Sequence, residues 1–243
     1  ITYSMSDLAN TRQAFEDGQV VVDLHRLTGD LSERSCLSQA EQTRATAFRF
    51  DRDRHRYMEC HGRLRHQVGA LLAQPPDAIP LETGPFGKPF VAEFPMHFNL
   101  SHAGDYYAAA FCRDHEVGID VEVLPEPSKL NGLVQHICHP AEGIRLNSLS
   151  SLTEREDRLL FYWTAKEALL KALGVGLQIE PDFIEVVGAP ADGTGTFAST
   201  VPEARADEWQ WHLLTHTSQC KLTVVVPRLP DSRILFPGFA KAS

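Results

Sequence analysis

The chain has 243 residues, of which 43% are hydrophobic and 23% charged, and its formal net charge is −9 at neutral pH. This length suffices for one large domain or two small ones. The acidic balance disfavours nucleic-acid binding, and no apolar run approaches the roughly 20 residues that cross a bilayer. The five cysteines are scattered without a Cys-x-x-Cys pair, so we expect a reduced, cytoplasmic protein without a disulfide framework or zinc knuckle.

A basic stretch in the first half stands out against this acidic background. The segment 44–65 contains seven arginines against three acids, namely Arg44, Arg49, Arg52, Arg54, Arg56, Arg63 and Arg65 against Asp51, Asp53 and Glu59. A local basic stripe in an acidic protein suits a small polyanion better than a nucleic-acid duplex. The alternative is a solvated helix face.

Several elements of the first half are predicted from local patterns. The Ser-Gln-Ala-Glu sequence at 38–41 is a capping box that should start a helix. A longer helix is expected from about Asp53 to Ala73, where apolar residues recur close to helical spacing. Two strands, 96–102 and 106–112, follow and are expected to pair as a hairpin.

Two loops of this half carry groups that suit phosphate. The loop from Gly84 to Pro89 is a glycine-proline turn with one lysine, Lys88, and it lacks the Walker pattern. Residues 99–104 end a strand with Ser101 and His102, which can donate hydrogen bonds to a phosphate. A serine-hydrolase site is disfavoured, because Gly-x-Ser-x-Gly is missing and adjacent strand residues point to opposite faces.

Acidic residues after this hairpin suggest a cation site. On a strand at 118–122, Asp120 and Glu122 would point to the same face. Together with Glu167 from a later helix, they could hold a hard divalent cation against phosphate oxygens. A solvated strand face is the alternative for Asp120 and Glu122.

That later helix is predicted to run from near Leu152 through about Ala172 and to stop near Gly174, with a capping box at 153–156. Trp163, Glu167 and Lys171 are spaced four apart and therefore form a column on one face. The alternatives are a core tryptophan and an ordinary surface pair of Glu167 and Lys171.

The order of a long helix followed by a hairpin occurs twice, because strands at 209–216 and 221–226 are predicted after the second helix. We therefore predict an α+β fold of two pseudo-symmetric halves, each a long helix packed on a small antiparallel sheet. The halves are expected at 1–124, which contains the Asp-x-Glu motif, and 125–243, which contains the Trp-x-x-Lys-Glu helix. Chance similarity is the alternative, since few residues are identical between the halves.

Four motifs in this order resemble the signature of one family. They are Gly-Lys-Pro at 87–89, Asn-Leu-Ser-His at 99–102, Gly-Ile-Asp-Val-Glu at 118–122 and Trp-x-x-Lys-Glu-Ala-x-x-Lys at 163–171. They look like those of the 4′-phosphopantetheinyl transferase superfamily, and the double-length chain resembles its monomeric Sfp-type members. The resemblance covers roughly residues 38–226.

The resemblance implies a reaction and its substrates. The phosphopantetheine arm of coenzyme A, bound between the halves, would be placed on a serine of an apo acyl or peptidyl carrier protein. Adenosine 3′,5′-bisphosphate would be the second product. Mg²⁺, or Mn²⁺ in its place, is the implied cofactor, and no nucleic-acid or membrane partner is expected.

The resemblance also implies roles for individual residues. Asp120, Glu122 and Glu167 would face the metal, Glu167 would also accept the serine proton, and Lys171 would contact the pyrophosphate. The nucleotide end, including its 3′-phosphate, would be held by Ser101, His102, Lys88 and Arg56. Arg44, Pro89, Asp120 and Lys166 complete the expected contacts with coenzyme A.

Two other functions stay open on the sequence. The chain could be a non-catalytic module that binds coenzyme A or a carrier protein, although every acidic motif position is intact. It could also be a Mg²⁺-dependent phosphotransferase that uses a nucleoside triphosphate.

The carrier protein is expected to dock on an apolar patch in the second half. Leu130, Leu133, Val134 and Ile137 have the helical spacing that suits such a patch. The alternative is that they pack into the core.

Overall fold

The computed structural model describes residues 5–123, 134–216, 220–230 and 232–236. Its helices are α1 (Met5–Glu16), α2 (Gln39–Thr46), α3 (Asp51–Leu72), α4 (Val134–Ile137), α5 (Pro140–Asn147) and α6 (Leu152–Leu173). One sheet has the strand order β11-β1-β5-β4, built from β1 (Val20–Arg26), β4 (His97–Ala103), β5 (Tyr106–Cys112) and β11 (Ile234–Leu235).

The second sheet has the strand order β6-β10-β9-β8-β7. Its strands are β6 (Gly118–Val123), β7 (Ile184–Val187), β8 (Thr194–Ser199), β9 (Trp209–His216) and β10 (Cys220–Pro227). A two-stranded ribbon, β2 (Leu81–Thr83) with β3 (Pro89–Val91), frames the glycine-proline loop. Apolar residues of β1 and β5 share one core cluster with those of β6 and β10, so the two sheets pack against each other.

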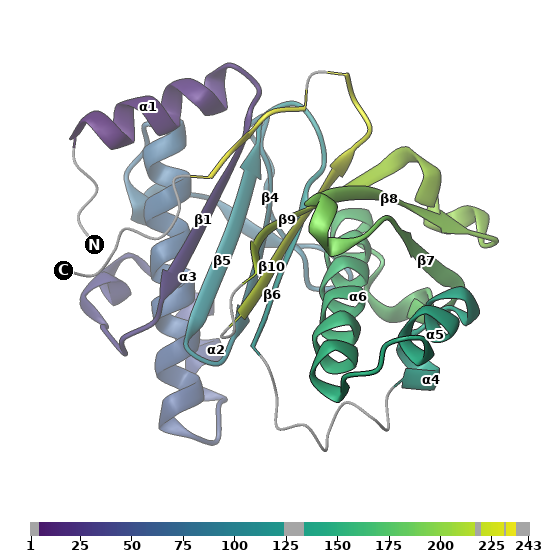
Figure 1. The fold of residues 1–243 in the computed structure, drawn as a ribbon. Helices are drawn as coiled ribbons and strands as arrows, with labels where there is room; N and C mark the ends of the chain where they lie inside the picture. The colour runs from purple at the N-terminus through teal and green to yellow at the C-terminus, as the bar shows by residue number, and fades with distance from the viewer. Residues whose placement is uncertain (1–4, 124–133, 217–219, 231, 237–243) are drawn as a thin grey trace.

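The helices α3 and α6 cover the outer faces of the two sheets (Figure 1). On α3, the buried residues Cys60, Leu64 and Val68 pack against Phe98 and Phe111 of the first sheet. On α6, residues such as Phe161, Ala165 and Leu169 pack in the core of the second half. The expected α+β fold of two pseudo-symmetric halves is therefore confirmed.

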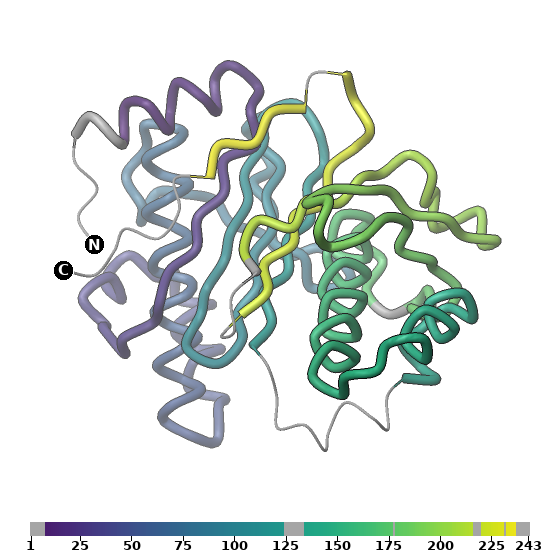
Figure 2. Tube along the Cα trace, viewed as in Figure 1, coloured from purple at the N-terminus to yellow at the C-terminus, as the bar shows by residue number. Residues whose placement is uncertain are grey.

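Both predicted hairpins are present, β4 with β5 and β9 with β10, each antiparallel. The first sheet is not wholly antiparallel, because β11 returns from the end of the described chain and pairs in parallel with β1 (Figure 2). Strand β6 pairs with β10, and Asp120 lies opposite Thr223. The expected boundary at 124/125 adjoins residues outside the described ranges and stays a prediction.

The ends of the long helices agree with the sequence in part. Ser38 and Glu41 form the expected capping box at the start of α2. The capping box expected at 153–156 is wrong, because the N-cap of α6 is Ser151, whose hydroxyl accepts a hydrogen bond from the Glu154 amide. Helix α6 ends at Gly174, whose φ of 69° is a left-handed conformation that glycine adopts without strain.

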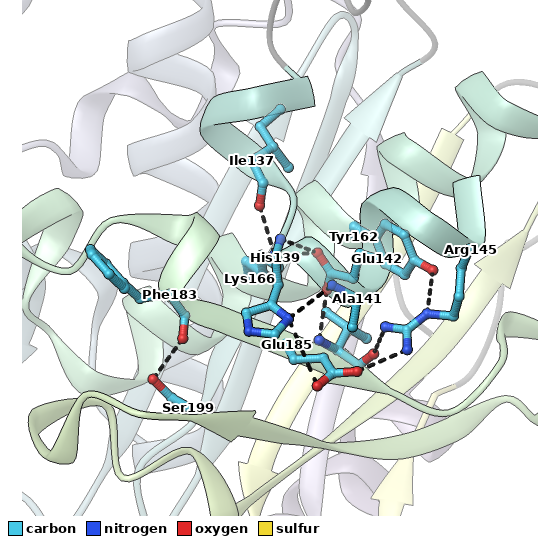
Figure 3. A network of polar contacts seen from close by, with 11 residues as sticks. Ile137, His139, Ala141, Glu142, Arg145, Tyr162, Lys166, Phe183, Glu185 and Ser199 are labelled. Carbon is cyan, nitrogen blue, oxygen red and sulfur yellow. Dashed lines mark hydrogen bonds and ion pairs between the residues drawn. The ribbon is translucent and has the colours of Figure 1, made fainter. Parts of the chain in front are cut away.

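Two matching ion pairs, one in each half, support the duplication. In the first half, the guanidinium of Arg65 on α3 donates to the Glu41 carboxylate of α2 at 2.7 Å. In the second half, the ammonium of Lys166 on α6 donates to the Glu142 carboxylate of α5 at 2.5 Å (Figure 3). Each acid is the third residue of its helix and belongs to a capping box. The same tie between a short and a long helix thus occurs once in each half.

The remaining expectations concern the membrane, the cysteines and the docking patch. Within the described ranges, none of the helices combines the length and apolarity needed to cross a bilayer. All five cysteines are buried and free. Leu130 and Leu133 of the expected docking patch lie outside the described residues. Val134 packs against the second core and Ile137 is buried in it, which confirms the core alternative for these two residues.

Candidate active site

A cleft of about 490 Å³ is lined by residues of both halves. The β2–β3 loop contributes Phe86, Lys88 and Pro89, strand β4 contributes Asn99, Ser101 and His102, and α6 contributes Glu167, Leu170 and Lys171. Six residues that the sequence assigned to ligand binding or catalysis therefore meet here: Lys88, Pro89, Ser101, His102, Glu167 and Lys171. They come from segments that lie far apart in the chain.

Asp120 is the buried centre of the polar contacts beside this cleft. Its Oδ1 accepts a hydrogen bond from Lys171 Nζ at 2.6 Å and another from Ser101 Oγ at 2.7 Å. Lys171 Nζ also donates to Ser101 Oγ at 2.9 Å, so the three side chains form a closed triangle. Burial raises the pKa of Asp120, and the hydrogen bonds and charge of Lys171 oppose that rise.

The second oxygen of Asp120, Oδ2, is buried and has no hydrogen-bond partner among the described residues. A buried carboxylate oxygen without a partner is costly, because it has lost its water and gained nothing in return. Asp120 can therefore accept a further hydrogen bond or a cation at Oδ2 without giving up its existing contacts.

Glu122 and Glu167 complete an acidic group around Asp120. Glu122 Oε1 accepts a hydrogen bond from the Trp163 indole at 2.9 Å, so the α6 column meets both acids of the β6 strand. Burial, followed by repulsion from Asp120, raises the pKa of Glu122 to about 7. Burial and Asp120 likewise raise the pKa of Glu167, against the pull of Lys171. The expected single-face arrangement of Asp120 and Glu122 is confirmed.

Strand β6 can lie this close to α6 because it begins with a glycine. A Cβ on Gly118 would stand 1.9 Å from the carbonyl oxygen of Ala168 and 2.6 Å from the amide nitrogen of Ala172. Any larger residue would push β6 away from the helix. The short distance between Asp120 and Lys171 thus depends on Gly118 two residues earlier.

The raised pKa of Glu122 predicts a pH dependence of stability. Between its ordinary pKa of 4.5 and about 7, the carboxyl is protonated in the folded state and ionised in the unfolded state. Its contribution is therefore fully present below pH 4.5 and is lost as the pH rises through about 7. We expect the free energy of unfolding to fall more in the wild type than in Glu122→Gln between about pH 5 and pH 8. Urea unfolding at both pH values tests this, and parallel pH profiles would contradict it.

The family resemblance implies a metal ion, and the structure offers oxygen atoms that could bind one. No set of three or more His, Cys, Asp or Glu side chains within the described ranges is arranged to hold a metal ion. Asp120, Glu122 and Glu167 nevertheless offer hard oxygen donors, which Mg²⁺ prefers. The unpartnered Oδ2 of Asp120 and the mutual repulsion of the three acids would both be relieved by a divalent cation.

Positive groups occupy the rest of the cleft and its surroundings. Lys88 pairs with Glu116 at 2.6 Å and donates to the carbonyl of Ala172 at 3.1 Å. Loss of solvation, followed by the charges of Arg56 and Lys171, lowers the pKa of His102. Arg56 itself is half-buried on α3, and its guanidinium lies 3.9 Å from the Asp105 carboxylate.

Two expected ligand contacts lie elsewhere. Lys166 does not line the cleft: its ammonium is fully buried and is held by the Glu142 carboxylate and the Ile137 carbonyl (Figure 3). Lys166 and Glu167 are neighbours on α6, so their side chains point from different faces of the helix. Arg44 is exposed and its guanidinium stacks 5.6 Å from the Phe48 ring centroid. A direct contact of Lys166 with coenzyme A is therefore not retained.

Sequence reasoning assigned no role to two residues beside the cleft, His61 and Glu116. His61 lines the cleft from α3, and Glu116 precedes β6 and holds Lys88. In the sequence, His61 is one residue of the basic stretch 44–65, and nothing there distinguishes it. Glu116 carried no motif of its own, so only the tertiary structure places it against Lys88.

The fold and the cleft together define a two-lobed α+β protein with an acid–lysine–serine cluster beside a site suited to a phosphorylated ligand. Two family models match this chain. One is described as 4′-phosphopantetheinyl transferase superfamily and matches residues 116–225, and the other as 4′-phosphopantetheinyl transferase, N-terminal, and matches residues 31–113.

Relatives of known name agree. The 4′-phosphopantetheinyl transferase HetI of Nostoc sp. is 34% identical over 161 residues, which are 64% of this chain and 67% of the relative. The transferase psf-1 of Bacillus pumilus is 35% identical over 143 residues, which are 58% and 59% of the two chains. The L-aminoadipate-semialdehyde dehydrogenase-phosphopantetheinyl transferase of Xenopus laevis is 33% identical over 166 residues, or 64% and 55%.

The chain belongs to the 4′-phosphopantetheinyl transferase superfamily. The matched segments span only about 55–67% of these three relatives.

Proposed function

We propose that this protein transfers the 4′-phosphopantetheine arm of coenzyme A to a serine of an apo acyl or peptidyl carrier protein. The observation that supports this most directly is the triangle of Asp120, Lys171 and Ser101 at the edge of the cleft. It places a cation and a hydroxyl donor beside a buried acid, where the pyrophosphate of coenzyme A can be bound. Family membership supports phosphopantetheine as the transferred group.

In this reaction the hydroxyl oxygen of the carrier serine forms a bond to the phosphorus of the phosphopantetheine arm. The bond between that phosphorus and the oxygen bridging to the nucleotide phosphate breaks, and adenosine 3′,5′-bisphosphate leaves. Lys171 would neutralise charge on the pyrophosphate, and the Ser101 hydroxyl would turn from Asp120 to donate a hydrogen bond to it. Phosphoryl transfer depends mainly on such positioning and charge neutralisation.

The proton of the carrier serine needs a base, for which we propose Glu167. This side chain lines the cleft, and burial together with Asp120 raises its pKa, which makes the carboxylate a better proton acceptor. No hydrogen bond commits it elsewhere among the described residues.

Mg²⁺, or Mn²⁺, belongs to the proposal as a cofactor held by Asp120, Glu122 and Glu167. Bound there, it would neutralise charge that develops on the pyrophosphate oxygens. Asp120 presents its unpartnered Oδ2 for this purpose. We further propose that the protein acts as a cytoplasmic monomer.

The test is to incubate the protein with an apo carrier protein, coenzyme A and Mg²⁺, and to read the carrier by intact mass. We expect a gain of one phosphopantetheine group, which disappears when the acceptor serine is replaced by alanine. ATP in place of coenzyme A should give no modification. Binding of coenzyme A without any mass gain on several carrier proteins would indicate a non-catalytic module and contradict the proposal.

Arg56 and His102 are proposed to recognise the 3′-phosphate of coenzyme A. Arg56→Ala should therefore weaken coenzyme A more than 3′-dephospho-coenzyme A, by roughly tenfold for one charge-assisted hydrogen bond. Calorimetry with both ligands measures the difference. Equal losses for the two ligands would show that Arg56 contacts another phosphate or none.

The carrier-docking role of Leu130 and Leu133 also stays a prediction. Leu133→Glu should raise the KM for the carrier protein and leave the KM for coenzyme A unchanged. A loss of thermal stability, or a shift in both KM values, would place Leu133 in the core instead.

A further inference from the structure

The cleft has two sides, which are separated by strand β4. Ser101 lies on one side of β4 and contacts Asp120 of β6 and Lys171 of α6, where the reaction is proposed to occur. His102 is the next residue and therefore points to the opposite face, the one that Phe98 shares with α3. The α3 side of the cleft therefore lies on the face of β4 opposite to Ser101, and it carries a second imidazole.

That imidazole belongs to His61 on α3. It lines the cleft together with Ser101, His102 and Lys171. Two histidines from different elements, α3 and β4, therefore face one end of the cleft.

The ring of His61 is held in one orientation. Its Nδ1 lies 3.1 Å from Glu41 Oε1, and its centroid lies 4.0 Å from that of the Tyr57 ring. The other oxygen of Glu41 accepts from the Ser38 amide at 2.8 Å and from Arg65 Nε at 2.7 Å. Glu41 is therefore itself fixed at both oxygens.

The charge state of Glu41 decides which nitrogen of His61 carries the proton. Burial acts to raise the pKa of Glu41, but hydrogen bonds from His61, Ser38 and Arg65 outweigh it and lower that pKa to about 2. An ionised Glu41 can only accept, so Nδ1 of His61 must be the donor of this hydrogen bond. Nε2, on the far side of the ring, has no partner in the part of the chain that the structure describes.

We propose that His61, oriented by Glu41, is a specificity-determining contact for the 3′-phosphate at the nucleotide end of coenzyme A; this inference rests on the proposed function. The transferred phosphorus must lie near Asp120 and Lys171, on the other side of β4. The 3′-phosphate, on the ribose and remote from the breaking bond, is then the anion that the α3 side can receive. Nδ1 donates to Glu41, which leaves Nε2 as the ring nitrogen that contacts the phosphate.

The test compares two substitutions that separate the nitrogens of His61. In His61→Asn, the side-chain amide can keep the Nδ1 contact with Glu41, but nothing replaces Nε2 in the cleft. In His61→Gln, the longer amide reaches toward the Nε2 position instead. His66→Asn is the matched control, because His66 is an exposed histidine of the same helix and does not line the cleft.

Calorimetry with Mg²⁺ present measures the affinities of each variant for coenzyme A and for 3′-dephospho-coenzyme A. We expect His61→Asn to weaken coenzyme A roughly tenfold and to change 3′-dephospho-coenzyme A less than about twofold. His61→Gln should fall between it and the wild type, and His66→Asn should match the wild type. If His61→Asn does not fold, the affinity ratio of His61→Gln decides the question by the same comparison.

An unchanged ratio of the two affinities in both His61 variants would overturn the inference, whether the affinities fall together or not at all. The proposed function is tested separately by the wild type, which must bind coenzyme A and modify the carrier protein. If the wild type does both and the ratio is unchanged, only the assignment of His61 fails.

Discussion

Replacing Asp120 with alanine is expected to reduce the rate of carrier modification by roughly a thousandfold. The substitution removes the acceptor of both Lys171 and Ser101, together with the free Oδ2. Losing such an interaction should cost several kcal/mol of transition-state stabilisation, and each ~1.4 kcal/mol is a tenfold change in rate. The measurement is kcat/KM from intact-mass time courses with saturating carrier protein.

Two variants and one condition make this result interpretable. Asp120→Asn retains the shape of the side chain and should lose nearly as much activity, because the charge is lost. Asp77→Asn, at an exposed acid that does not line the cleft, should behave as the wild type. Activity should also disappear in excess EDTA and return with Mg²⁺ or Mn²⁺. Full activity of Asp120→Ala in excess EDTA would refute both the metal and the role of Asp120.

Replacing Lys166 with methionine is expected to destabilise the protein by about 3–5 kcal/mol, the usual cost of leaving a buried charge without its partner. The side chains of Lys166 and Glu142 are both 0% exposed, and their charged atoms lie 2.5 Å apart. Burial lowers the pKa of Lys166 and raises that of Glu142, and their pairing opposes both shifts. Urea unfolding near neutral pH measures the loss.

The double variant Lys166→Met with Glu142→Gln provides the control. The Glu142→Gln side chain is neutral, so no buried charge is left unpaired when Lys166 is removed. Part of the lost stability should therefore return. We expect the recovery to be incomplete, because the two carboxylate oxygens of Glu142 accept hydrogen bonds from the backbone amides of His139 and Val186. Glutamine has only one side-chain oxygen, so it cannot accept both hydrogen bonds in the same geometry. If Lys166→Met instead keeps the stability of the wild type and binds coenzyme A weakly, the stabilising role is contradicted. Lys166 would then contact coenzyme A, as the sequence predicted.

The repeating architecture and the orientation of several charged side chains could be predicted from the sequence. Helical periodicity and end signals located α3 and α6 to within about two residues, although only α3 buries a spaced set of residues and α6 is buried over most of its circumference. Strand alternation placed Asp120 and Glu122 on one face of β6, and the helical spacing of Trp163 and Lys171 brought each to one of these acids. These are local regularities, in which the period of the backbone fixes where a side chain points.

Which of the charged residues share the cleft depends instead on how the elements pack against one another. Lys166 and Lys171 belong to the same motif, but α6 turns Lys166 into the core against Glu142 and Lys171 toward Asp120. His61 acquires a role through Glu41, which lies on another helix, and Lys88 meets Glu116 from a distant loop. Such pairings depend on how separate elements pack, and no pattern within one element records them. Local periodicity therefore predicts which way a side chain points from its helix or strand. The packing of separate elements decides which residue that side chain contacts.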